Sequence, residues 1–170
     1  MEIRPQHLDS ARKLDLGREA AVSLERVLPG DAEAVQEFVR GLSLQSRRER
    51  FFAPVSELTP GQLARVVSGP GLSVAAWHRG RIIGLAEYAP RAADAEFAVV
   101  VADDWRGRGL GEALVSVLVA QARSAGIQAF AGLTLAGNRA MRALARKLGF
   151  ALHPDEDPAL VRMERELAGA

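Results

Sequence analysis

Apolar and polar residues alternate along several short segments of the chain, and this period of two is typical of strands. It predicts strands at residues 22–27, 72–77, 81–88, 93–101, 129–135, 150–152 and 160–167. Segment 93–101 is apolar on both faces, so we expect it to lie in the middle of a sheet. His78-Arg79-Gly80 predicts a hairpin turn between two of these strands, because glycine tolerates positive φ.

Other segments repeat their apolar residues every three or four positions, which predicts helices. These segments are residues 32–42, 43–52, 61–67, 110–125 and 138–148. Asp31, Ser43 and Asn138 precede three of them and are suited to cap a helix. The order of elements predicts a mixed α/β (α+β) fold, with one sheet covered by helices. Residues 1–20 lack a clear apolar period, so we expect a mobile leader followed by a single domain over residues 21–170.

The composition narrows the classes of protein that fit. Hydrophobic residues make up 48% of the chain and charged residues 25%, as in globular proteins. No apolar run approaches the ~20 residues of a membrane helix, and the N-terminus lacks a secretion signal. The absence of cysteine excludes disulfides and cysteine nucleophiles, and a net charge of +1 gives no general attraction to nucleic acid. The histidines lack metal-ligand spacing, so we expect no bound metal. Taken together, these features predict a cytoplasmic protein without a nucleic-acid or membrane partner.

A glycine-rich segment, Arg106-Gly-Arg-Gly-Leu-Gly111, joins the predicted central strand to the longest helix. Amides in the first turn of a helix have no acceptor within the helix and attract anions. Glycines let a phosphate approach the backbone, and Arg106 and Arg108 could bind a diphosphate. A tight turn without a ligand is the alternative interpretation. The spacing of a dinucleotide loop is absent because position 114 is leucine, and no Walker-type lysine follows.

Two segments in this order resemble the GNAT superfamily of N-acetyltransferases. Arg106–Gly111 is similar to the family's acetyl-CoA loop, and Asn138–Phe150 to its second signature, an asparagine followed by a helix that ends in Gly-Phe. Leu42–Phe52 and Glu96–Trp105 also resemble the GNAT domain of Pat-type bacterial protein lysine acetyltransferases. The resemblance implies a mostly antiparallel sheet of six or seven strands, splayed at its centre and flanked by about four helices.

The resemblance also implies a cofactor, an acceptor and a set of contacts. The cofactor is acetyl-CoA, and the acceptor is a protein with a reactive lysine, for which AMP-forming acyl-CoA synthetases are candidates. Pantetheine is expected to run along Val99 and Val101, beside Asn138, which can equally be a plain helix cap. The diphosphate is expected at the loop residues Arg106, Gly107, Arg108, Gly109, Leu110 and Gly111.

Acetyl transfer to an amine requires a base, because a lysine amine has a pKa near 10.4 and is protonated at neutral pH. Glu96 is our candidate: it lies on the predicted central strand, three residues before Val99, and an apolar setting would strengthen it as a base. A structural glutamate paired with an arginine is the alternative, and Glu87 and Tyr88 are weaker substitutes. Relatives often place a tyrosine, which protonates the leaving sulfur, at the position of Ala145, so that step is in doubt.

These observations leave three functions open. The first is direct acetyl transfer to a protein lysine in a ternary complex. The second is transfer to a small-molecule amine, and the third is a non-catalytic acyl-CoA sensor, which the alanine at position 145 favours. We expect a monomer or a weak homodimer.

Overall fold

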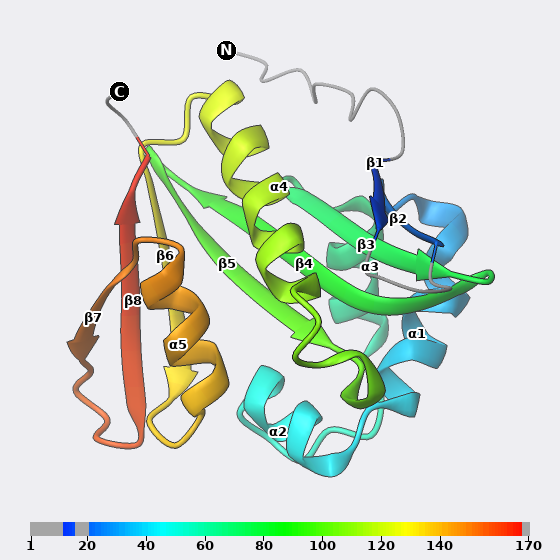
Figure 1. Cartoon of the computed structure of the whole chain (residues 1–170), viewed down its shortest axis with the longest axis horizontal. Coiled ribbons are helices and arrows are strands. Elements are labelled where there is room, and N and C mark those ends of the chain that lie inside the picture. Colours follow the sequence, from blue (N-terminus) through cyan, green and yellow to red (C-terminus); the bar gives the residue numbers. More distant parts are fainter. Residues whose placement is uncertain (1–11, 16–20, 168–170) are drawn as a thin grey trace.

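The structure is a computed structural model that describes residues 12–15 and 21–167. Its centre is a sheet with the strand order β1-β2-β3-β4-β5-β6-β8-β7 (Figure 1). The strands are β1 (Arg12–Asp15), β2 (Ala21–Arg26), β3 (Leu72–His78), β4 (Arg81–Arg91), β5 (Asp94–Val101), β6 (Ala129–Leu135), β7 (Ala151–Pro154) and β8 (Leu160–Glu166). Within the described sheet, β5 and β6 pair in parallel and the other neighbours pair antiparallel.

Helices cover both faces of the sheet. They are α1 (Ala32–Gly41), α2 (Leu44–Phe51), α3 (Pro60–Ser68), α4 (Leu110–Ser124) and α5 (Arg139–Lys147), with short 3-10 turns at Pro29–Asp31 and Asp103–Trp105. Helices α4 and α5 lie on one face, and α1 and α3 lie on the other (Figure 1). The core is accordingly divided into two clusters of buried apolar side chains, one beneath α4 and one beneath α1 and α3.

The sheet opens at its centre. Strands β5 and β6 pair only at Ala95↔Phe130 and Glu96↔Ala131, and from there they diverge (Figure 1). Aromatic rings hold the closed end of this V, because Phe130 lies 5.6 Å from Phe97 and 5.5 Å from Tyr88 between ring centroids. The divergence leaves the facing edges of both strands without a partner strand over their later residues, and this opening positions the candidate site.

The structure confirms the predicted fold class, and each strand and helix expected from the sequence is present with small shifts in its ends. The sheet has eight strands rather than six or seven because Arg12–Asp15, within the expected leader, pairs with β2. The remaining leader residues lie outside the described residues. The described residues form five α-helices rather than about four. The predicted hairpin turn is present, with Arg79 and Gly80 at φ 49° and 75°.

None of the helices formed by the described residues combines the length and the apolar character needed to cross a bilayer. Likewise, no three or more histidine and acidic side chains in the described part of the chain converge as metal ligands would.

Candidate active site

A cavity of about 350 Å³ occupies the opening between β5 and β6. The N-terminal end of α4, one side of α5 and part of α2 complete its walls. All of the residues predicted to form the site line this cavity except Arg108. The splay therefore brings together the predicted loop, the predicted strand and the predicted helix cap, although they are distant in the sequence.

The glycine loop presents an open cradle at the start of α4. Gly107 and Gly109 have φ of 72° and 81°, values that residues with a Cβ adopt only with strain. A Cβ at either position would meet no atom within 4 Å, so it would occupy the open space of the cradle. Among the described residues, the N–H groups of residues 107–112 have no hydrogen-bond acceptor. Free amides and the dipole of a 15-residue helix therefore converge on one point, as an anion site requires.

The edge of β5 that faces the opening is also free to bind. The amide of Ala102 donates to Ile83 on β4, and successive amides along a strand point to opposite edges. Because the β4–β5 register is regular, the N–H groups of Val99 and Val101 point away from β4 into the cavity. An extended chain in the cavity can bind to them as an added strand would.

Arg106 and Asp103 tie the loop to α2. The Arg106 guanidinium donates to Ser46 Oγ at 2.8 Å and to Glu49 Oε2 at 3.1 Å. Asp103 accepts from the Ser46 hydroxyl at 2.7 Å, and from the hydroxyl and the amide of Ser43 at 2.8 and 3.1 Å. Burial alone would raise the pKa of Asp103, but these hydrogen bonds and the charge of Arg106 lower it overall. In this structure the Arg106 side chain thus holds α2, and its predicted contact with a diphosphate stays a prediction.

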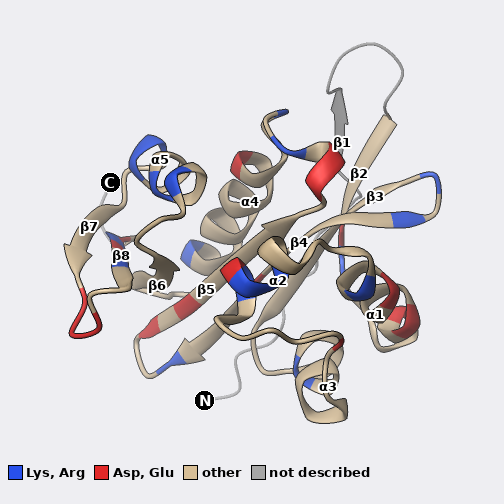
Figure 2. Cartoon of the chain, turned by 90° about the horizontal axis from the view of Figure 1, so that it is seen from below, with Lys and Arg blue, Asp and Glu red and all other residues tan. Residues whose placement is uncertain are grey.

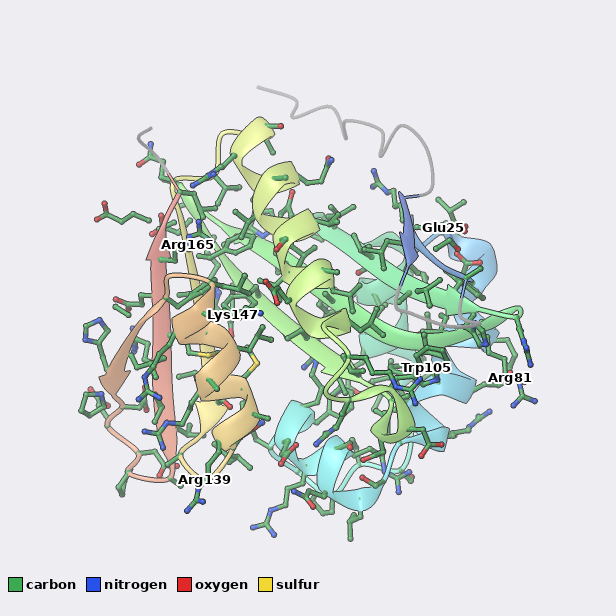
Figure 3. All side chains as sticks on the ribbon, viewed as in Figure 1. Glu25, Arg81, Trp105, Arg139, Lys147 and Arg165 are labelled. Atoms are coloured by element: carbon green, nitrogen blue, oxygen red, sulfur yellow. The ribbon has the colours of Figure 1, made fainter. Side chains whose placement is uncertain are left out.

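Arg108 lies outside the cavity. Its guanidinium stacks on the Trp105 ring at 4.9 Å from the ring centroid, and the His78 ring lies 4.8 Å from the same ring between centroids. Figure 3 shows Trp105 in the loop that leads into α4. The predicted contact of Arg108 with a diphosphate also stays a prediction.

Glu96 lies where this cavity meets a second, larger cleft of about 1010 Å³ on the side of α3. Its carboxylate is 2.6 Å from the guanidinium of Arg91, and the two side chains are 44% and 75% exposed. The expected apolar setting is therefore absent, and the ion pair is the alternative that the sequence left open. Exposed ion pairs contribute about 0–1 kcal/mol, so Arg91 does not lock the carboxylate against an incoming amine.

The two substitutes for Glu96 are less available. Glu87 lies on the same face of the sheet, on β4, and forms an ion pair with Arg50 in which the side chains are only 27% and 18% exposed. Tyr88 is buried, and burial raises its pKa although Arg26 opposes the shift, so the phenol stays protonated at neutral pH. Of the three groups, Glu96 is the one that borders both cavities with an exposed carboxylate.

Helix α5 contributes the remaining predicted groups. The Asn138 side chain accepts from the amide of Met141 at 3.0 Å, so it caps the helix and also lines the cavity. Ala145 is buried in the core and does not line the cavity. Figure 2 shows basic residues concentrated on α5, and Lys147 pairs with Glu112 in the first turn of α4. That pair links the two helices, and Figure 3 labels Lys147 on α5.

Sequence reasoning missed several groups at the site. Ser46 and Asp103 are far apart in the chain, and no local pattern links them. Thr134, which lines the cavity from β6, appeared only as part of a predicted strand. The available signal was its spacing: Thr134 is four residues after Phe130, so both side chains lie on the buried face of the strand.

A sheet splayed between two parallel strands, with free amides at a helix N-terminus beside the opening, forms a site for an extended ligand that carries an anionic group. The chain belongs to the acetyltransferase (GNAT) family, whose pattern matches residues 38–150. This family uses acetyl-CoA. The open cradle fits the diphosphate of acetyl-CoA, and the free edge of β5 fits its pantetheine arm.

Individual relatives agree with this assignment. The chain is 32% identical to "Acetyltransferase PA5475" of Pseudomonas aeruginosa over 153 residues, which are 85% of this chain and 81% of that one. It is 34% identical over 93 residues to an L-methionine sulfoximine/L-methionine sulfone acetyltransferase of Pseudomonas paraeruginosa, covering 51% and 54% of the two chains. The crystal structure of the GNAT domain of S. lividans PAT matches with a TM-score of 0.85 and 27% identity, over 92% of this chain and 96% of that one.

Proposed function

We propose that the chain transfers an acetyl group from acetyl-CoA to a lysine amine of a protein, by direct attack in a ternary complex. The observation that carries the proposal is the meeting of the two cavities at Glu96. One cavity has the free amides suited to coenzyme A, and the other is the larger cleft on the side of α3. An amine that enters the larger cleft arrives beside Glu96, where the cleft meets the cavity between β5 and β6.

The residues of the chain perform three tasks in this proposal. The amides of the glycine loop bind the diphosphate, and the amides of Val99 and Val101 hold pantetheine along β5. When bound, acetyl-CoA supplies an electrophilic thioester. An N–H of β5 polarises its carbonyl, and such donors contribute a few kcal/mol in a transition state. Glu96 accepts the proton of the lysine ammonium, directly or through a water molecule.

Departure of the thiolate needs no side-chain acid in this scheme. A thiol has a pKa near 8.5, so its anion is a tolerable leaving group near neutral pH. The buried alanine at position 145 is therefore compatible with turnover. The chain also contains no cysteine, which removes relay through an acetyl-cysteine and leaves direct transfer.

A protein acceptor is supported by the size of the cleft and by the match to the GNAT domain of a PAT protein. AMP-forming acyl-CoA synthetases are the first acceptors to test. The second candidate is acetylation of a small amine, which the similarity to an L-methionine sulfoximine/L-methionine sulfone acetyltransferase favours.

Incubation of a cell lysate with isotopically labelled acetyl-CoA and the protein separates the candidates. Mass spectrometry is expected to detect labelled acetyl-lysine in proteins, and much less of it when Glu96→Gln replaces the wild type. Label found only in small amines would establish the second candidate instead. Binding of acetyl-CoA without any labelled product would contradict both and indicate a sensor.

A further inference from the structure

The cavity contains a buried hydroxyl that the proposed function does not use. Thr134 on β6 is 2% exposed, and its Oγ1 has no hydrogen-bond partner among the described residues. Two other buried side-chain atoms share this condition, Nε of Arg47 and Nε of Arg142, but each of these arginines donates from another nitrogen. Thr134 has a single polar side-chain atom, so its whole hydrogen-bonding capacity is unmet.

An unmet hydroxyl in this position calls for an explanation. Leaving a buried polar group without a partner is destabilising, and valine would fill the same volume without that penalty. A ligand that supplies the missing partner explains why a hydroxyl is present. The explanation requires that the residue can reach the ligand, and Thr134 meets this condition because it lines the cavity between β5 and β6.

The position of Thr134 in the sheet indicates which part of the ligand it would meet. Pairing of β5 with β6 ends at Ala131, three residues before Thr134, so Thr134 lies where the strands have separated. The free amides of β5 are on one wall of the cavity, and Thr134 and Asn138 are on the other. The diphosphate cradle is at the N-terminus of α4, so the segment between the two strands is the pantetheine segment.

We propose that the Thr134 hydroxyl binds an amide of the pantetheine arm, so that the arm is held from β6 as well as from β5. Pantetheine carries two secondary amides, and a hydroxyl can donate to an amide oxygen or accept from an amide N–H. Because Oγ1 itself is buried in this structure, the contact requires a change of the Thr134 side-chain rotamer that turns the hydroxyl toward the cavity. This inference rests on the proposed use of coenzyme A.

Isothermal titration calorimetry with two ligands tests it. Coenzyme A contains pantetheine, whereas adenosine 3′,5′-bisphosphate lacks it. Thr134→Val is expected to raise the Kd for coenzyme A about 5- to 10-fold, as the loss of one hydrogen bond does, and to leave the Kd for the bisphosphate unchanged. Thr134→Ser keeps the hydroxyl and is expected to bind coenzyme A within about 2-fold of wild type.

The melting temperature of the ligand-free protein supplies an independent readout. Thr134→Val is expected to melt at or above the wild-type temperature, because valine removes an unpaired buried hydroxyl. An unchanged Kd for coenzyme A in Thr134→Val would overturn the inference and leave the proposed function intact. An equal increase in Kd for coenzyme A and for the bisphosphate would also overturn the inference, because the substitution would then have distorted the site in general. Failure of the wild type to bind coenzyme A would overturn the proposed function itself.

Discussion

At the scale of single residues, the surroundings of two neighbouring carboxylates differ in a way that the sequence did not reveal. Glu87 and Glu96 lie on neighbouring strands, on the same face, and each has an arginine partner. The pair with Arg50 is mostly covered, and the pair with Arg91 is largely solvated. A solvated pair exchanges partners easily, so in the proposed function Glu96 accepts the proton of the substrate and Glu87 stays paired with Arg50.

Glu96→Gln is therefore expected to lower kcat by about 10²- to 10⁴-fold, the usual contribution of a general base, with little change in the Kd for acetyl-CoA. Steady-state kinetics and calorimetry measure the two quantities. Glu87→Gln is the matched control, since it removes the neighbouring carboxylate. A loss of kcat in Glu87→Gln equal to that in Glu96→Gln would show that we have assigned the base to the wrong strand.

Asp103 makes a pH-dependent contribution to stability. Its folded-state pKa is lowered, so the carboxylate stabilises the fold above its unfolded pKa of about 3.9, and this contribution disappears as the pH falls through the folded value. Asp103→Asn is expected to reduce the free energy of unfolding at pH 7 by less than about 1 kcal/mol, because the carboxylate is exposed and water screens its charge. Urea titrations should show that the difference from wild type shrinks below about pH 4. A difference that persists at low pH would mean that the charge is not responsible.

At the scale of elements, local patterns were enough to predict most of the sheet and its helices. The helix predicted at 43–52 begins where Ser43 accepts from the amide of Ser46, as a serine cap should. The exception is β1, whose four residues lack the alternation of apolar and polar residues that predicted the other strands. Its conformation comes from pairing with β2, which is a tertiary effect.

The position of the glycine loop at the start of α4 was predictable because its signal is local, whereas the groups around it were not. The hydrogen bonds of Asp103 reach 57 and 60 residues along the chain. The pairing of Glu96 with Arg91 depends on how the β4–β5 hairpin folds. The free hydroxyl of Thr134 depends on every side chain that surrounds it.

Gly109→Ala tests the loop as an element. Alanine at φ 81° introduces roughly 1–2 kcal/mol of backbone strain, and its methyl group points into the cradle. We expect the Kd for coenzyme A to rise at least about 10-fold in calorimetry. Gly61→Ala is a suitable control, because that glycine lies in α3, has open space around it and needs no positive φ. Wild-type affinity in Gly109→Ala would argue against the cradle.

At the scale of the whole molecule, the divergence of β5 and β6 opens the cavity in which we propose that coenzyme A binds, and Glu96 lies where this cavity meets the larger cleft. Strands β5 and β6 must stay paired at one end for the opening at their other end to keep its shape. Phe130, fully buried among aromatic rings, occupies that closed end. The stability of the core and the geometry of the site are therefore linked.

Phe130→Ala is expected to reduce the free energy of unfolding by about 3–5 kcal/mol, because it leaves a cavity at this junction. Urea denaturation followed by circular dichroism measures the change. Leu28→Ala offers a comparison, since Leu28 is exposed and its truncation should change stability by less than about 0.5 kcal/mol. Similar losses in both variants would contradict the role given to Phe130.

The central claim is that the main chain of residues 106–111 binds the diphosphate of coenzyme A. An NMR titration of the ¹⁵N-labelled protein with coenzyme A tests it most directly, because each amide of the loop gives its own signal. Large shifts are expected for the amides of Gly107, Gly109 and Gly111, together with those of Val99 and Val101. Saturable binding that leaves the loop amides unmoved and shifts other signals would contradict the account.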